Sequence, residues 1–161
     1  MENDVPVISP SSIRLATESE QQALEALQRR ASLMNEHDRA PLLANPDAIA
    51  LPLEQITRGR VLVAEHDGMI AGFAVVLPRA DGEAELDGLF VEPNRWRSGI
   101  GRALVDHAAA MARAEGAATL HVIGNPHAAG FYASCGFVTV GEFATRFGPA
   151  LAMRRSLSRM E

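Results

Sequence analysis

The sequence has few of the features that would place it outside the class of ordinary globular proteins. Its only cysteine is Cys135, so no disulfide can form within the chain. No apolar run approaches the roughly 18 residues of a membrane span, and the acidic N-terminus lacks the basic start of a signal peptide. The 15 basic residues are outnumbered by 20 acidic ones, whereas general nucleic-acid binders are basic. We therefore expect a cytoplasmic protein with no nucleic-acid or membrane partner.

Length and composition favour one domain. A chain of 161 residues, of which 47% are hydrophobic, is long enough to bury a sizeable core. We expect a single domain over residues 1–161, in which residues 1–11 form a loose tail. The five histidines show no metal-ligand spacing, so we predict no metal site. The sequence leaves the oligomeric state open between a monomer and a homodimer.

Apolar periodicity divides the chain into strands and helices. Helical spacing covers residues 18–36, 100–115 and 127–134, and the proline-containing stretch 37–59 indicates a broken second helix. The strand-like runs are 12–16, 61–66, 69–77, 83–91, 119–123, 137–140, 142–147 and 150–154. A strand, a helix and a strand stand at the centre of this order, and we expect a right-handed crossover there.

The segment from Leu86 to Leu104 carries the strongest functional signal. A strand-like run ends at a proline, and a basic loop with glycines at 99 and 101 opens directly into an amphipathic helix. Main-chain N–H groups at such a helix start bind phosphate or pyrophosphate. A dinucleotide fingerprint fits poorly, because its third glycine would fall at Leu104, and no Gly-Lys-Ser/Thr of a Walker loop is present. A purely structural loop stays open as the alternative.

Two segments in this order resemble a known family. They are Val-Glu-Pro followed by the loop with Gly99 and Gly101, and Asn125 followed by Phe-Tyr-x-x-x-Gly-Phe at 131–137. Together they resemble the GNAT superfamily of acyl-CoA-dependent N-acetyltransferases. The resemblance implies an α/β (α+β) fold with a mixed, mostly antiparallel sheet of six to seven strands. About four helices would flank this sheet, which would splay at its central β-α-β unit.

The same resemblance implies direct transfer of the acetyl group of acetyl-CoA to a primary amine of a small molecule or peptide. A non-catalytic acyl-CoA sensor of the same fold is the alternative hypothesis. The residues that would line the acetyl-CoA site lie on two strand ends, the loop and a short helix. They are Leu89, Phe90 and Val91 along the pantetheine, the amides of Arg97, Ser98, Gly99, Ile100, Gly101 and Arg102 at the pyrophosphate, and Asn125 and Phe131 on the opposite wall.

The resemblance also implies catalytic roles. Tyr132 falls at the family's general-acid position, where it would protonate the leaving thiolate. Glu85 matches a strand position that supplies the base in some members, and Asp87 lies two residues further on, so either carboxylate or water could take the amine proton. Strand alternation predicts that both lie on one face with Leu89 and Val91. Trp96 departs from the family pattern, which has Arg or Gln there.

Overall fold

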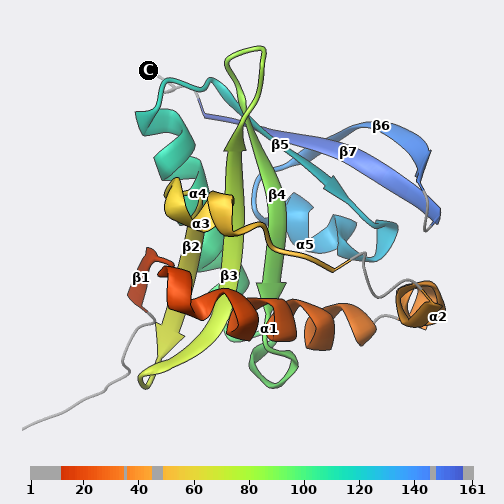
Figure 1. Ribbon diagram of the computed structural model, residues 1–161. Helices are drawn as coiled ribbons and strands as arrows, with labels where there is room; N and C mark the ends of the chain where they lie inside the picture. Colours follow the sequence, from red (N-terminus) through yellow and green to blue (C-terminus); the bar gives the residue numbers. More distant parts are fainter. Residues whose placement is uncertain (1–11, 35, 45–48, 146–147, 158–161) are drawn as a thin grey trace, which may run out of the picture.

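The computed structural model describes residues 12–34, 36–44, 49–145 and 148–157. These residues form a seven-stranded sheet of order β1-β2-β3-β4-β5-β7-β6 (Figure 1). The strands are β1 (Ser12–Leu15), β2 (Val61–His66), β3 (Met69–Pro78), β4 (Ala84–Val91), β5 (Thr119–Gly124), β6 (Val138–Thr145) and β7 (Gly148–Ser156). The helices are α1 (Gln21–Leu33), α2 (Glu36–Ala44), α3 (Leu53–Thr57), α4 (Ile100–Ala114) and α5 (Ala129–Ser134), with short 3-10 turns η1 (Glu18–Glu20), η3 (Pro93–Arg95) and η4 (Pro126–Ala128). The predicted mixed, mostly antiparallel sheet is confirmed.

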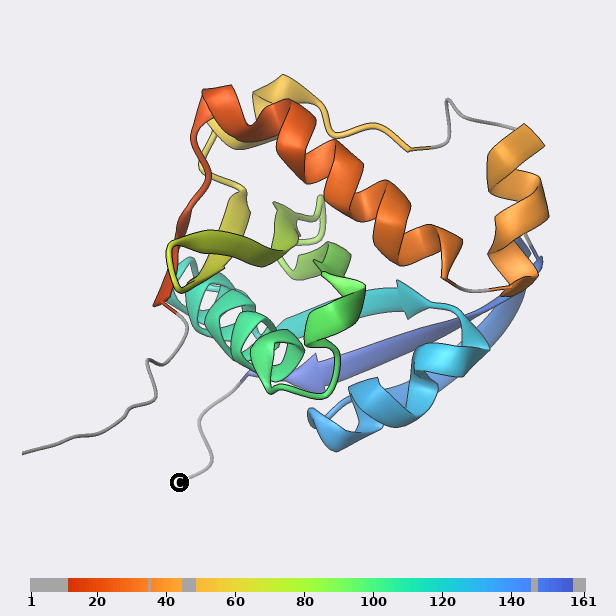
Figure 2. The same ribbon diagram turned by 90° about the horizontal axis from the view of Figure 1, so that it is seen from below.

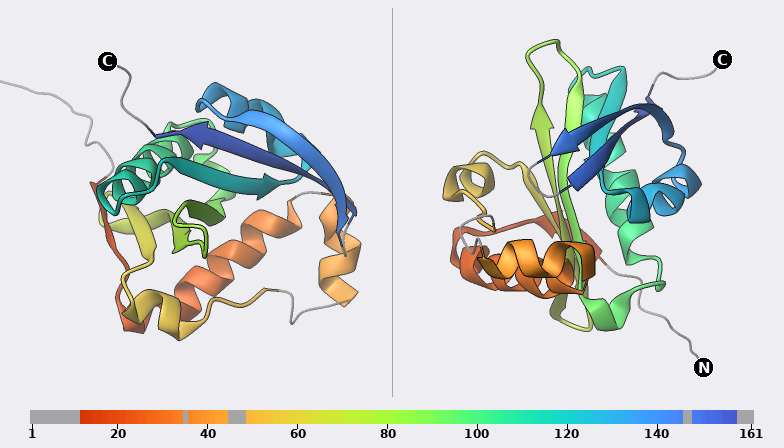
Figure 3. Two further views of the ribbon diagram at one scale, coloured as in Figure 1. Left: turned by 90° about the horizontal axis from the view of Figure 1, so that it is seen from above. Right: turned by 90° about the vertical axis from the view of Figure 1, so that its right-hand side faces the viewer.

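Helices cover both faces of the sheet. Figures 2 and 3 show α1 and α3 on one side and α4 and α5 on the other. Leu24 and Leu27 of α1 are buried with Phe73 on the first face, and Leu104 of α4 is buried with Leu86 on the second. Because β2 and β3 are covered on both faces, their sequences are nearly continuous apolar runs rather than alternating ones. None of the helices in the described ranges is long and apolar enough to cross a bilayer.

The sheet splays at its centre. The pair β4–β5 is parallel and its register runs only from Ala84 opposite Leu120 to Leu86 opposite Val122, whereas the other strand pairs are antiparallel. Beyond this point β5 turns away from β4, as Figure 1 shows. The second half of β4 therefore has an edge that no neighbouring strand covers in the described structure. The predicted opening at the central β-α-β unit is confirmed.

A bulge in β4 changes which side chains share a face. Val75 of β3 lies opposite Gly88, and the next residue, Val76, lies opposite Leu86, so Asp87 has no partner across the ladder. Leu86, Leu89 and Val91 therefore pack in the same cluster beneath α4, although two residues rather than one stand between the first two. The prediction that Glu85 and Asp87 share a face with Leu89 and Val91 was wrong for both carboxylates. Leu86, which stands between them, lies on the face of Leu89 and Val91, because the bulge interrupts simple alternation.

Other corrections concern element boundaries. Residues 138–145 form one strand, not two, because the register shift between Thr139 and Gly141 absorbs the expected break. The predicted helix over residues 18–36 is divided into η1 and α1, and α2 already begins at Glu36. The predicted loose tail, residues 1–11, lies outside the described residues, as do residues 146 and 147 of the predicted strand.

Candidate functional site

The uncovered edge of β4 presents main-chain groups from alternate residues. The N–H of Glu92 donates to the carbonyl of Ala71 at 2.8 Å, although Val91 is the residue opposite Gly72. Val91 is therefore in a non-hydrogen-bonded antiparallel pair, and so is Leu89, two residues earlier. The N–H and C=O groups of Leu89 and Val91 point away from β3 into the space that β5 has left. The backbone of Phe90 bonds to β3 instead, and its ring packs on Phe73 with centroids 5.3 Å apart.

The loop after β4 provides a row of free amides. Arg97 and Gly99 have φ angles of 68° and 91°, which turn the chain sharply into α4. The first N–H bonded inside the helix is that of Ala103, which donates to the carbonyl of Gly99 at 3.0 Å. Over the described ranges, no main-chain carbonyl accepts a bond from the N–H groups of residues 97–102. With the positive end of the helix dipole behind them, these amides are suited to bind an anion.

The two glycines of the loop serve different needs. At Gly99 the positive φ disfavours other residues, while the space around a side chain would be open. At Gly101 the need is for close approach, since a Cβ there would lie 3.1 Å from Cζ of Phe131 and 3.7 Å from Cγ2 of Val91. The end of β4, the first turn of α4 and the helix α5 thus meet around Gly101.

Charged side chains near the loop are already paired in part. Arg30 of α1 donates two hydrogen bonds to the carboxylate of Glu92, which offsets a negative charge close to the loop. Arg102, which the sequence places among the anion contacts, directs its guanidinium to the carbonyl of Ser134 at 2.8 Å. Its side chain therefore links α4 to α5 in this structure, while its main-chain N–H is one of the free amides of residues 97–102.

Tyr132 is placed beside this opening by its neighbours on both sides. Its ring lies edge-on to Phe131 and Phe137, with centroids 5.3 and 5.5 Å away, and a Cβ at Gly124 of β5 would lie 3.0 Å from its Cε2. Burial raises the pKa of the phenol to about 12. Among the described residues the hydroxyl has no hydrogen-bond partner, yet it is not fully enclosed. It is a protonated donor with a free position.

Asn125 has a structural task that its motif does not reveal. Its side-chain oxygen accepts a hydrogen bond from the N–H of Ala128 at 3.0 Å and so caps η4. The cap directs the chain from the end of β5 into α5. Asn125 therefore orients the wall that carries Phe131 and Tyr132, rather than only lining it.

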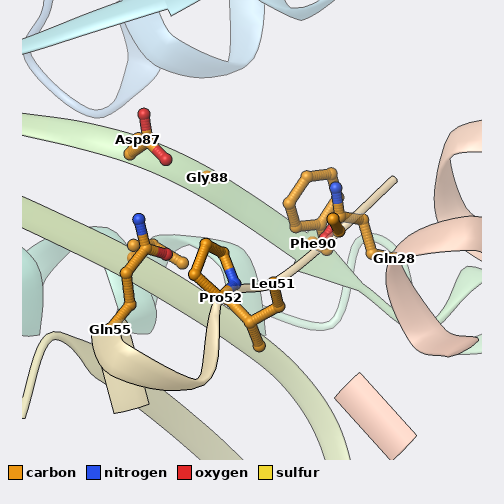
Figure 4. Close-up of a pocket in the computed structure, with 9 residues that line it drawn as sticks. Gln28, Leu51, Pro52, Gln55, Asp87, Gly88 and Phe90 are labelled. Carbon is orange, nitrogen blue, oxygen red and sulfur yellow. The ribbon is translucent and has the colours of Figure 1, made fainter. Parts of the chain in front are cut away.

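A cavity of about 250 Å³ lies on the α1 face of β4, next to the bulge (Figure 4). Its polar side chains come from three elements, Gln28 of α1, Gln55 of α3 and Asp87 of β4. The remaining lining residues are Ala50, Leu51, Pro52, Val75, Gly88 and Phe90. Neither glutamine was predicted from the sequence, because a glutamine on a helix surface carries no motif.

The two candidate bases differ in position. Asp87 lines the cavity and Glu85 does not, because Glu85 lies earlier on β4, opposite Leu77 and beside His121 of β5. Neither carboxylate has a hydrogen-bond or ion-pair partner among the described residues. Although Asp87 is exposed to solvent, the protein around it removes part of its hydration and raises its pKa.

Comparisons with known proteins agree with this geometry. The sequence model described as the acetyltransferase (GNAT) family matches residues 21–137. No curated protein matches the sequence. A solved ribosomal-protein-alanine N-acetyltransferase from Brucella melitensis is similar to the chain, with 27% identity, a TM-score of 0.69 and coverage of 90% of this chain and 99% of that one.

Two further solved structures are similar. A nourseothricin acetyltransferase shares 29% identity at a TM-score of 0.56, over 61% of this chain and 65% of that protein. The PaiA N-acetyltransferase of Thermoplasma acidophilum, solved in complex with coenzyme A, shares 19% identity at a TM-score of 0.74, over 92% and 99% of the two chains. At that identity the likeness concerns the fold.

Proposed function

Because the chain belongs to the acetyltransferase (GNAT) family, we propose that it is an N-acetyltransferase that transfers the acetyl group of acetyl-CoA directly to a primary amine. The observation that carries this proposal is the convergence around Gly101 of the β4 edge, the free amides of α4 and the wall of α5. Such a gap can hold a long thioester along a strand edge with its diphosphate at a helix start. A structural neighbour solved with coenzyme A supports the same ligand.

Each part of the gap has a distinct role in this proposal. The amides of residues 97–102 bind the pyrophosphate. The main chain of Leu89 and the N–H of Val91 bind the pantetheine arm, since the carbonyl of Val91 already accepts the indole N–H of Trp96. A main-chain N–H on this edge of β4 polarises the thioester carbonyl, as preorganised donors do in acyl transfer. Bound acetyl-CoA supplies an activated acyl group, so no nucleophilic residue of the protein is required.

Proton transfer completes the reaction. A lysine-like amine has a pKa of about 10.4, so only roughly one molecule in 10³ is neutral at pH 7. We assign the removal of its proton to Asp87, directly or through water, because this carboxylate lines the cavity beside the bulge. Tyr132 donates a proton to the departing thiolate, since its pKa of about 12 keeps the phenol protonated at neutral pH.

The lining of the cavity supports a proposal for the class of acceptor. One carboxylate, two amide side chains and the ring of Phe90 surround about 250 Å³. This combination favours a cationic amine on a short, partly apolar chain, from a small molecule or a peptide. The net charge of −5 assists the approach of such a cation.

The proposal is tested by measuring thiol release from acetyl-CoA in the presence of a panel of amines and short peptides. We expect amine-dependent release, with the acetylated amine identified by mass spectrometry. The chain contains no lysine, so acetyl groups cannot be lost to lysine side chains of the protein itself. Tight acetyl-CoA binding without turnover on any amine would instead support the non-catalytic sensor.

Substitution of Asp87 separates the two candidate bases. We expect Asp87→Asn to lower kcat/KM at pH 7 by about tenfold, with water in the open cavity taking over part of the proton transfer. Because the pKa of Asp87 is raised, the wild-type rate falls as pH drops through that raised value, and the variant loses this acid limb. The deficit shrinks toward pH 10, where more of the amine is already neutral. A larger loss for Glu85→Gln than for Asp87→Asn would reassign the base.

A further inference from the structure

Trp96 forms a contact that neither the family motif nor the proposed reaction accounts for. It is the only tryptophan of the chain and stands where the family has Arg or Gln. Its indole Nε1–H donates to the carbonyl of Val91 at 2.8 Å. The side chain is 48% exposed, so it contributes little to the core. The hydrogen bond joins the loop to the last residue of β4.

The carbonyl of Val91 needs such a donor. It lies on the edge of β4 that faces away from β3, and β5 has already diverged at this level. In a continuous sheet the neighbouring strand would supply the N–H. Here the indole occupies that place, and the carbonyl is held by a residue of the loop itself.

Trp96 is adjacent in the chain to the residues that shape the loop, so its hydrogen bond to Val91 acts on the loop directly. Trp96 immediately precedes Arg97, whose φ of 68° begins the turn. Gly99, with a φ of 91°, ends the turn two residues later. These two residues set the direction of the amides at 97–102. The hydrogen bond of Trp96 to Val91 therefore links the edge of β4 to the amides of residues 97–102 through only a few residues of the chain.

On the basis of the proposed function, we propose that Trp96 is a positioning residue for acetyl-CoA. Its bond to Val91 keeps the amides that bind the diphosphate at a set distance and angle from the strand edge that binds the pantetheine. The uncharged indole acts through loop geometry, where Arg or Gln would offer a polar side chain. The contribution of Trp96 is thus confined to ligands that reach both the strand edge and the loop.

The test compares two acetyl donors, acetyl-CoA and the shorter S-acetylpantetheine, in two variants of Trp96. Trp96→Phe keeps a ring but lacks the N–H, and Trp96→Gln keeps an N–H donor but lacks the ring. We expect Trp96→Phe to lower kcat/KM for acetyl-CoA by roughly three- to tenfold, the effect of one hydrogen bond. For S-acetylpantetheine, which lacks the diphosphate, we expect a change below about twofold. Trp96→Gln recovers part of the loss with acetyl-CoA.

Several results would overturn the inference. The first is an unchanged kcat/KM of Trp96→Phe with acetyl-CoA. The second is an equal loss of kcat/KM in Trp96→Phe with acetyl-CoA and with S-acetylpantetheine. The third is a Trp96→Gln variant whose kcat/KM with acetyl-CoA is no higher than that of Trp96→Phe. Thermal unfolding of each variant without ligand provides the control, and we expect midpoints close to that of the wild type because the side chain is half exposed. An equal loss with both donors would indicate general loosening of the strand end.

Fluorescence of the wild type separates this inference from the proposed function. Since Trp96 is the only tryptophan, its emission reports on the loop alone. We expect coenzyme A to change this emission with saturation, and pantetheine to change it much less. If acetyl-CoA neither binds nor turns over in the wild type, the proposed function fails; if it does both and the emission stays constant, only the role of Trp96 fails.

Discussion

We expect Tyr132→Phe to lower kcat by roughly 100-fold while the affinity for acetyl-CoA stays within about twofold, since general acid catalysis contributes on the order of 10²–10⁴. The substitution removes only the hydroxyl. The ring keeps its edge-on contacts with Phe131 and Phe137 and its close approach to Gly124. Because the hydroxyl has no partner among the described residues, its removal leaves no buried group unsatisfied. Steady-state kinetics and calorimetry with acetyl-CoA measure the two quantities.

The pH profile provides an independent check on Tyr132. With a pKa of about 12, the phenol stays protonated through the range in which the amine becomes neutral. The wild-type rate should therefore show no loss attributable to Tyr132 between pH 7 and pH 10. A kcat for Tyr132→Phe equal to that of the wild type would mean that solvent protonates the thiolate and would remove Tyr132 from the mechanism.

Replacement of Gly99 by aspartate should weaken acetyl-CoA binding by about 30-fold. A carboxylate among the free amides competes with the diphosphate and repels it; at an effective dielectric constant of about 20, two charges some 8 Å apart interact by roughly 2 kcal/mol. Space for the side chain is available, because no atom lies within 4 Å of a Cβ built at this position. Calorimetric titration with acetyl-CoA measures the loss.

The matched control is Gly99→Asn, which has nearly the same size and also tolerates a positive φ. It isolates the charge from the backbone effect, so Gly99→Asp should bind acetyl-CoA much more weakly than Gly99→Asn. Raised salt concentration should narrow this difference through screening. Equal affinities of the two variants would reject the assignment of the amides at 97–102 to the diphosphate.

Substitution of Gly101 by aspartate should also weaken acetyl-CoA binding, but for a different physical reason. Aspartate in the first turn of a helix is favourable for the helix itself. A Cβ at this position, however, would press on Phe131 at 3.1 Å. We therefore expect Gly101→Asp to lower acetyl-CoA affinity at least as much as Gly99→Asp, and Gly101→Ala to retain part of it. The contrast separates steric displacement of α5 from charge repulsion.

Several features of the site could be predicted from local patterns. The strand β2 and the start of α4 at Ile100 depend on apolar spacing and on one glycine, and both occur where expected. The row of free amides follows from the same local rule, because the first turn of any helix lacks internal acceptors for its N–H groups. Such features involve residues a few positions apart, so the sequence alone contains their cause.

Other features depend on partners that are distant in the chain. The bulge at Asp87 arises from the pairing of β4 with β3, and alternation alone placed Asp87 on the wrong face relative to Leu89. The cavity joins Gln28 and Gln55, two residues without a motif, to Asp87. These are juxtapositions across the sheet, and no local propensity contains them.

The sequence by itself determined the order of the central elements, the start of α4 with its free amides and the resemblance that indicated the family. Only the tertiary structure decided that β5 leaves β4 after Leu86 and that the indole N–H of Trp96 donates to the carbonyl of Val91. It also decided that Asp87 rather than Glu85 lines the cavity. The physical reason is range: backbone propensity and helix-end geometry act between neighbours in the chain, whereas register, bulges and cavities result from packing between segments that the sequence holds far apart.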